Sequence, residues 1–170
     1  EGIDIWYLLA CKGQDEKKIM DFCNRHLSRK ALWQAFLLTF DGVRRYEGGW
    51  HLESRLMFPS YVLLESENEE CLIKELRECG KTEGFGKYLA RMNMEEEKFL
   101  KGLYGGGHHL KMSRGILFKG AARITEGPLK GMENRLCKID RHKRLAHVRT
   151  VIGRDFQYVL AGLEITERVL

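Results

Sequence analysis

The sequence has no long apolar run, no paired cysteines and none of the common catalytic motifs. No stretch approaches the roughly 18 uninterrupted apolar residues of a membrane-spanning helix, and the first residues show neither part of a secretion signal. The five cysteines are scattered without a Cys-x-x-Cys pair, which argues against a disulfide framework and a zinc site. Neither Gly-x-Ser-x-Gly nor His-Glu-x-x-His occurs. These absences favour a cytoplasmic protein that is not an enzyme, needs no cofactor or metal, and does not contact a membrane.

Acidic residues are also scarce, but only in the last third of the chain. Residues 115–170 carry 11 Lys and Arg against 6 Asp and Glu, whereas residues 1–114 carry 18 of each, so the net charge of +5 comes from the C-terminal part. With 170 residues, of which 44% are apolar, the chain can form one medium domain or two small ones. A neutral first domain and a basic second one would have different partners.

Short alternating runs separated by turn residues predict a β-rich C-terminal part. Pro128 fixes a turn between Gly127 and Gly131, and the basic run from Asp140 to Arg144 reverses the chain again. Five strands are expected, at Ala121–Thr125, Met132–Ile139, Leu145–Ile152, Phe156–Ala161 and Leu163–Thr166. Tight connections between short strands favour a small SH3-like barrel over an open sheet, which would expose two long edges.

The N-terminal part mixes helical and strand periods and predicts an α+β domain in the order β-α-β-β-α-β-α. Apolar residues at helical spacing indicate amphipathic helices at Gln14–Leu27, Glu69–Cys79 and Met94–Tyr104. Gly80 is expected to end the second helix. Strands are expected at Trp6–Ala10, within Leu32–Met57 as a hairpin about Gly48-Gly49, at Phe58–Leu64 and from Phe85.

The C-terminal pattern resembles the KOW domain of the NusG transcription factors over nearly all of residues 118–166. The shared order is strand, Gly127-Pro128 with Gly131, strand, Ile139-Asp140, a basic turn, strand, and Ile152-Gly153-Arg154. The family usually has another Gly three positions after Gly131, where this chain has Asn134, a residue that tolerates the left-handed region. The runs Thr125–Asn134 and Lys138–Arg144 are most similar to the specialised paralogues called LoaP-type antiterminators.

The N-terminal part resembles the NGN domain of the same family. Trp6-Tyr7 lies in the expected opening strand, and Phe58-Pro59-Ser60-Tyr61-Val62 is similar to the family's Phe-Pro-Gly-Tyr-Val, with Ser60 in place of Gly. The resemblance implies an NGN domain at residues 1–104, an α/β sandwich whose antiparallel sheet is flanked by helices, and an SH3-like KOW barrel at residues 115–170. Residues 105–114 would be a short linker, and the His108-His109 pair within it lacks the carboxylates or thiols of a metal site.

In NusG-type proteins an apolar patch on the NGN domain contacts the clamp helices of the largest RNA polymerase subunit. The resemblance implies that the residues of this patch are Trp6, Tyr7, Phe58, Pro59, Ser60 and Tyr61. Alternation along a strand predicts that one of Trp6 and Tyr7 points inward and the other outward. The same division is expected for Phe58 and Tyr61, for which packing in the core is the alternative.

The basic surplus of the KOW region predicts contact with RNA. Between Leu129 and Arg154 only Glu133 and Asp140 are acidic. The expected RNA-binding residues are Lys130, Arg135, Lys138, Arg141, His142, Lys143, Arg144, His147, Arg149 and Arg154. No recognition helix is available for a DNA major groove, whereas strands and loops can meet the phosphates and loop bases of an RNA hairpin. A solvated basic face is the alternative.

The resemblance implies a monomeric transcription antitermination factor. Its NGN domain would bind RNA polymerase and suppress pausing and termination, and its KOW domain would capture an RNA hairpin in the leader transcript of the operon it controls. Two other functions fit the sequence. A housekeeping NusG would couple polymerase to ribosomal protein S10 or to the termination factor Rho and would need no basic patch. A ribosome-associated RNA-binding protein would not bind polymerase at all.

Overall fold

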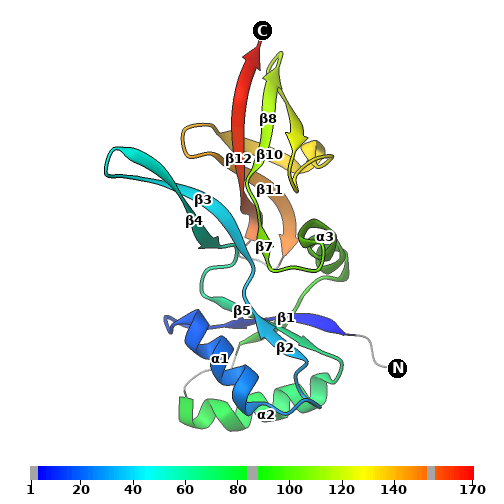
Figure 1. The fold of residues 1–170 in the computed structure, drawn as a ribbon. Coiled ribbons are helices and arrows are strands. Elements are labelled where there is room, and N and C mark those ends of the chain that lie inside the picture. Colours follow the sequence, from blue (N-terminus) through cyan, green and yellow to red (C-terminus); the bar gives the residue numbers. More distant parts are fainter. Residues whose placement is uncertain (1–3, 84–87, 153–155) are drawn as a thin grey trace. The chain divides into compact units, whose positions relative to one another are not determined.

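The computed structural model describes residues 4–83, 88–152 and 156–170 of the chain. Within them it has three α-helices, one short 3-10 helix and twelve strands in several sheets, so the predicted α+β class is confirmed (Figure 1). The chain folds into two compact units. Unit 1 comprises Glu1–Leu37 and Phe58–Glu97, and unit 2 comprises Leu38–Met57 and Lys98–Leu170. The chain therefore passes between the units at three places, which differs from the single linker expected at residues 105–114.

Unit 1 is built on a four-stranded antiparallel sheet. β1 (Ile5–Ala10) and β5 (Tyr61–Ser66) lie in its centre, and β2 (Gln34–Phe36) and β6 (Leu89–Arg91) form its edges. Helices α1 (Glu16–His26) and α2 (Glu69–Glu83) pack on one face (Figure 1), where their apolar side chains join those of the strands in a buried core. α1 begins where the Asp15 carboxylate accepts hydrogen bonds from the backbone N–H groups of Lys17 and Lys18, at 2.9 and 3.2 Å.

Both faces of this sheet are buried, which corrects the expectation for its first strand. Tyr7 belongs to the core on the helix side, and Trp6, on the opposite face, packs edge-on against Phe36 with ring centroids 5.0 Å apart. Their exposed fractions are 1% and 6%, so neither side chain points outward. Alternation assigns neighbouring residues to opposite faces, but it predicts exposure only where one face is left to solvent.

Helix α2 is longer than predicted. It continues through Gly80 to Glu83, because a glycine inside a helix costs only about 1 kcal/mol and the buried Leu72 and Leu76 anchor the turns before it. The strand expected from Phe85 begins outside the described residues.

Strand β5 begins at Tyr61 rather than at Phe58. Ser60 has a φ of +72°, and this left-handed conformation interrupts the extended backbone. Glycine adopts this conformation without steric cost, whereas serine adopts it less readily.

A long β-hairpin forms one part of unit 2. β3 (Thr39–Tyr46) and β4 (Gly49–Leu56) pair along their whole length and are joined by Glu47 and Gly48, whose φ values are +51° and +77°. Two successive positive φ values are typical of the tight turns that match the twist of paired strands. The predicted hairpin is confirmed, with its turn one residue earlier than Gly48-Gly49.

The rest of unit 2 contains a five-stranded sheet in the order β10-β11-β12-β8-β9. Its strands are β8 (Ser113–Phe118), β9 (Ala121–Glu126), β10 (Leu136–Asp140), β11 (Leu145–Ile152) and β12 (Phe156–Val169). β12 pairs antiparallel with β11 in its first half and parallel with β8 in its second half (Figure 1). The order ends at β9 and β10, so the strand pairings of the described residues do not close a barrel.

Two strand predictions for this sheet are corrected. β12 is one continuous strand instead of the two expected at residues 156–161 and 163–166, because its pairing changes from β11 to β8 without a break in the backbone. The strand expected at Met132–Ile139 is shorter, since Glu133–Arg135 forms the 3-10 helix η1, which contains Asn134. The Glu133 carboxylate accepts a hydrogen bond from the backbone N–H of Ile124 at 3.0 Å, and this bond lowers the pKa of Glu133. The turn expected at residues 153–155 lies outside the described residues.

The expected linker at residues 105–114 is partly built into unit 2. β7 (His109–Leu110) pairs parallel with β3, and β8 begins within the same segment. The ring nitrogens of His109 lie 2.8 Å from Thr39 Oγ1 and 2.7 Å from Asp41 Oδ1. The other oxygen of Asp41 accepts a hydrogen bond from the backbone N–H of Met112 at 3.0 Å. These contacts attach the segment to the hairpin.

The hairpin packs on β12 so closely that Gly162 has no room for a side chain. A Cβ atom at this position would collide with the carbonyl oxygen of Asp41 and lie 2.8 Å from the Met112 sulfur. Gly162→Ala is therefore expected to lower the free energy of unfolding by about 1–3 kcal/mol, the usual cost of overpacking. Denaturant unfolding measures the change, with Gly102→Ala at an open helical position as the control. Equal stability of Gly162→Ala and the wild type would contradict this packing.

Candidate nucleic-acid interface

Positive charge is concentrated in unit 2 more strongly than the division of the sequence after residue 114 suggests. Unit 2 carries 18 Lys and Arg against 9 Asp and Glu, whereas unit 1 carries 11 against 15. The difference arises because the hairpin brings Arg44, Arg45 and Arg55 into the same unit as the basic C-terminal strands. Unit 2 thus produces the electrostatic field that attracts a polyanion.

A groove of about 600 Å³, called here the basic groove, lies between the hairpin and the C-terminal sheet of unit 2. Its lining residues are Val43, Arg44, Arg45, Trp50 and Arg55 of the hairpin and Lys138, Asp140, His142, Lys143, Leu145, His147, Tyr158 and Leu160 of the sheet and its β10–β11 turn. Five of these are Lys or Arg, and one is acidic. A volume of this size is within the range of ligand-binding clefts.

The acidic residue of the groove, Asp140, holds the turn between β10 and β11 in shape. Its Oδ1 atom accepts a hydrogen bond from the backbone N–H of Lys143 at 2.9 Å, and this bond lowers the pKa of Asp140. At the end of the turn Arg144 has a φ of +54°, and its carbonyl oxygen accepts a hydrogen bond from the backbone N–H of Leu163 at 2.9 Å. The basic side chains of this turn are therefore carried on a fixed backbone.

Trp50 lies among cations at the hairpin wall of the groove. Its side chain is 39% exposed. The guanidinium carbons of Arg45 and Arg144 lie 5.9 and 5.2 Å from its ring centroid, and the His142 ring meets it edge-on at 6.0 Å. Aromatic rings with cations beside them are typical of surfaces that bind single-stranded nucleic acid.

A second aromatic pair lies at the sheet wall of the groove. The rings of His147 and Tyr158 are tilted against each other with centroids 4.3 Å apart. Burial lowers the pKa of His147 from 6.5, and the nearby Lys138 lowers it further. The imidazole is therefore mostly neutral at pH 7 and can stack without carrying charge.

The structure brings together part of the predicted RNA-binding set. Lys138, His142, Lys143 and His147 line the basic groove, and Arg144 reaches the Trp50 ring beside it. These residues come from β10, β11 and the turn that joins them.

The other predicted RNA-binding residues do not line the groove. Arg135 packs on the Phe99 ring of α3 (Met94–Tyr104), 3.7 Å from its centroid, and donates a hydrogen bond to the carbonyl oxygen of Arg149 at 3.1 Å. It therefore helps to hold the fold together. The side chains of Lys130, Arg141 and Arg149 are exposed elsewhere on unit 2. Arg154 lies outside the described residues.

Sequence reasoning missed the hairpin wall, namely Arg44, Arg45, Trp50 and Arg55, and also Tyr158. A local pattern could have indicated it, because two arginines precede the tight turn and Trp50-His51 follows it. Basic residues interleaved with aromatic ones are a feature of nucleic-acid-binding surfaces. Its position beside the C-terminal strands, about a hundred residues away in sequence, could not be read from that pattern.

Only part of the predicted polymerase-binding set is at the surface. Phe58 is 2% exposed, and Trp6 and Tyr7 are also buried. Pro59 and Ser60 are exposed and Tyr61 is half-buried. The core-packing alternative therefore holds for Phe58, and the exposed residues of this set form the turn before β5.

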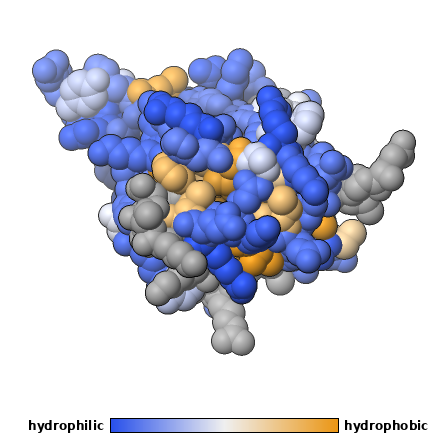
Figure 2. Space-filling model, turned by 90° about the horizontal axis from the view of Figure 1, so that it is seen from below, coloured by the Kyte–Doolittle hydropathy of each residue, from blue (hydrophilic) through white to orange (hydrophobic). Residues whose placement is uncertain are grey.

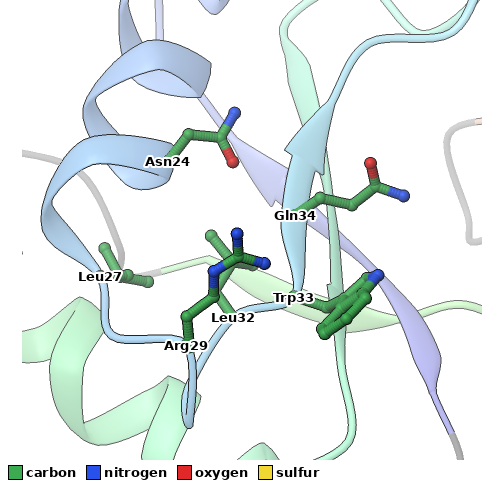
Figure 3. Close-up of a pocket in the computed structure, with 6 residues that line it drawn as sticks. All are labelled: Asn24, Leu27, Arg29, Leu32, Trp33 and Gln34. Carbon is green, nitrogen blue, oxygen red and sulfur yellow. The ribbon is translucent and has the colours of Figure 1, made fainter.

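A hollow of about 510 Å³ lies on unit 1 after the end of α1 (Figure 3). Its lining residues are Asn24, Leu27, Arg29, Leu32, Trp33 and Gln34. Trp33 is 58% exposed, with the guanidinium carbon of Arg29 5.5 Å from its ring centroid. Seen from the side where α1 and α2 lie, the surface is mostly hydrophilic with small apolar patches (Figure 2). Trp33 is thus an exposed tryptophan with an arginine near its ring, and both residues lie outside the basic groove.

Neither a metal site, nor a membrane-spanning helix, nor a known relative identifies a function for the described residues. Within the ranges that the structure describes, no three His, Cys, Asp or Glu side chains lie together as a metal site would require. No helix in those ranges combines the length and the apolar character of a membrane span. No family model matches the chain, and no curated protein matches it.

Proposed function

We propose that the chain is a NusG-type transcription factor of the LoaP antiterminator kind, which binds RNA polymerase through unit 1 and a structured nascent RNA through the basic groove of unit 2. The four-stranded sheet with two helices on one face fits the expected NGN domain, and strands β8 to β12 fit the expected KOW domain. In this proposal the factor binds the active state of polymerase better than the paused state, so it suppresses pausing and termination. Binding energy alone shifts that equilibrium, without a catalytic step or cofactor.

The composition of the basic groove is the observation that carries the RNA part of the proposal. Its five Lys and Arg side chains can contact phosphates, and its aromatic rings can contact bases. The groove is lined by strands and turns, which are the elements that contact RNA hairpins and loops. Proteins that read duplex DNA more often place a helix in the major groove.

The polymerase part rests on the turn that precedes β5. We assign the direct contact to Pro59, Ser60 and Tyr61, because they reach the surface. Trp6, Tyr7 and Phe58 would support the turn from the core. This assignment keeps the predicted region and changes the roles of its residues.

Both contacts belong to one chain, which makes the second binding event intramolecular. Effective concentrations for short connections are of about millimolar order. Modest separate affinities can then combine into a long-lived complex on transcripts that carry the RNA hairpin. Selective recruitment needs no sequence-specific contact by unit 1.

Binding of the full-length protein to RNA and to polymerase tests the proposal. A fluorescein-labelled RNA hairpin is titrated at two salt concentrations, and log Kd is expected to change with log salt by about 0.7–0.9 per neutralised phosphate. Core RNA polymerase is expected to co-purify with the protein in a pull-down. RNA binding without polymerase capture would support the ribosome-associated alternative, and polymerase capture without RNA binding would support a housekeeping NusG. Failure of both would overturn the proposal.

A further inference from the structure

We propose that Trp50 is a stacking platform for an unpaired base of the RNA, and that Arg45 and Arg144 hold the phosphates next to that base. The inference rests on the proposed RNA-binding function of the basic groove. It specifies the form of RNA that binds in the groove, namely a single-stranded loop rather than the stem of the hairpin.

The exposure of Trp50 has no explanation in the packing of the fold. Its cross-strand partner is Arg45, and the residue whose ring meets it edge-on is His142, so both of these contacts are with polar side chains. A large apolar ring left 39% exposed among cations contributes little to a core. The same ring offers a flat face to a nucleobase, and every base has a matching aromatic face.

The guanidinium groups of Arg45 and Arg144 lie over the Trp50 ring, but farther from it than in a closed stack. Their guanidinium carbons lie 5.9 and 5.2 Å from the ring centroid. Arg135 on Phe99 shows what a closed guanidinium stack looks like in this protein, with a distance of 3.7 Å. Arg45 and Arg144 therefore lie near enough to bind the phosphates of a nucleotide whose base covers Trp50.

The backbone holds this arrangement before any ligand binds. Arg45 and Trp50 are fixed opposite each other by the pairing of β3 with β4. Arg144 has a φ of +54°, a conformation that arginine rarely adopts. Its carbonyl oxygen accepts a hydrogen bond from the backbone N–H of Leu163 in β12. A strained residue that the surrounding structure holds in place is a common feature of binding sites.

Stacking on Trp50 requires a base that is not already stacked on both sides. Bases inside a stem are covered by their neighbours, whereas loop bases can be splayed out onto aromatic side chains. Across the groove, the paired rings of His147 and Tyr158 offer a second surface for an adjacent base. The structure therefore assigns a single-stranded stretch of at least two nucleotides to the groove.

The test compares protein variants on matched RNA ligands. The probe is a fluorescein-labelled RNA hairpin with a mixed-sequence loop, prepared intact and with abasic sites replacing the loop bases. Trp50→Ala is expected to weaken binding of the intact hairpin by about 5- to 150-fold, the usual effect of losing one stacked base. Trp50→Phe should restore much of the affinity, and Trp33→Ala, the exposed tryptophan of unit 1, should leave it unchanged.

The abasic RNA separates stacking from an indirect effect of Trp50 on packing. If Trp50 stacks on a base, the wild type binds the abasic RNA more weakly than the intact RNA. Trp50→Ala should then bind the abasic RNA almost as well as the wild type does. If Trp50→Ala weakens the binding of intact and of abasic RNA by the same factor, the residue acts through the fold and the stacking proposal fails. Thermal unfolding of each variant checks that the fold is retained.

Fluorescence gives a second readout that needs no loss of affinity. In Trp33→Phe the remaining tryptophans are Trp50 and the buried Trp6. Intact loop RNA is expected to quench this emission, and abasic RNA to quench it much less. No quenching by saturating intact RNA would overturn the proposal.

Failure of stacking and failure of RNA binding are distinguishable. Removal of the groove cations, which include Arg45 and Arg144 next to Trp50, tests RNA binding while the tryptophan itself is retained. If that change abolishes binding while Trp50→Ala has no effect, the groove binds RNA but Trp50 is not a platform. If wild type does not bind the hairpin at all, the proposed function itself is wrong.

Discussion

Replacing Arg45, Lys138, Lys143 and Arg144 together by glutamine is expected to weaken RNA binding by about 4- to 1000-fold at low salt. Three of these side chains line the basic groove, and Arg144 reaches Trp50 beside it. Exposed charge pairs contribute roughly 0.2–1 kcal/mol each, and about 1.4 kcal/mol corresponds to a tenfold change in affinity. Losing four phosphate contacts should also reduce the slope of log Kd against log salt by about 3. Titration by fluorescence anisotropy at several salt concentrations measures both quantities.

The matched control removes four exposed cations from unit 1. Its substitutions are Arg25→Gln, Arg29→Gln, Lys30→Gln and Arg77→Gln. The control changes the net charge by the same amount and is expected to leave RNA affinity and its salt dependence nearly unchanged. Equal losses in the two variants would show that RNA responds to the net charge of the protein and not to the groove.

Phe58→Ala is expected to lower the free energy of unfolding by about 3–5 kcal/mol. The side chain is only 2% exposed, so its removal leaves a cavity that its neighbours can only partly fill. Proteins of this size have a total stability of roughly 5–15 kcal/mol, so the variant should unfold at a much lower urea concentration. Pro59→Ala, at an exposed position, is the control.

Measurements of unfolding and of polymerase affinity together test the division of roles around the turn before β5. Tyr61→Ala should cost less stability than Phe58→Ala, since Tyr61 is half-buried. It should instead lose about 1–4 kcal/mol of polymerase affinity, as truncation of an aromatic contact residue does. A stable Phe58→Ala variant that fails to bind polymerase would show that Phe58 is itself a surface contact.

Local elements were largely predictable because their causes are local. α3 spans Met94–Tyr104 as its helical period predicts, and α1 begins after the acidic cap that its sequence contains. The hairpin follows from its turn residues, with Glu47 and Gly48 in the required left-handed conformation. These features depend on residues within a few positions of one another.

Features that depend on pairing partners were less predictable. β12 is continuous because a second strand, β8, takes over its pairing where β11 ends, at Gly162. Trp6 and Tyr7 are both buried because both faces of their sheet are covered, which the alternation of β1 does not show. In each case the outcome is decided by elements distant in sequence.

The candidate site, too, could be predicted only where it depends on residues close together in sequence. The basic turn at Lys138–Arg144 was predicted from its charge, and most of it lines the groove. The opposite wall comes from the hairpin, which the sequence division placed in the first domain. Residues 115–170 alone would therefore carry one wall of the groove and lack Trp50. For this reason RNA binding has to be measured on the full chain.

Cross-linking of the full-length protein to an RNA hairpin by ultraviolet light shows whether both walls of the basic groove contact RNA. Mass spectrometry then identifies the peptides that carry covalently attached nucleotides. We expect cross-links in two segments far apart in sequence, one around Trp50 in the hairpin and one between Lys138 and His147. The variant with the four groove cations replaced by glutamine should form neither cross-link. Cross-links confined to one of these segments, or found mainly on α1 and α2 of unit 1, would contradict RNA binding by both walls of the groove.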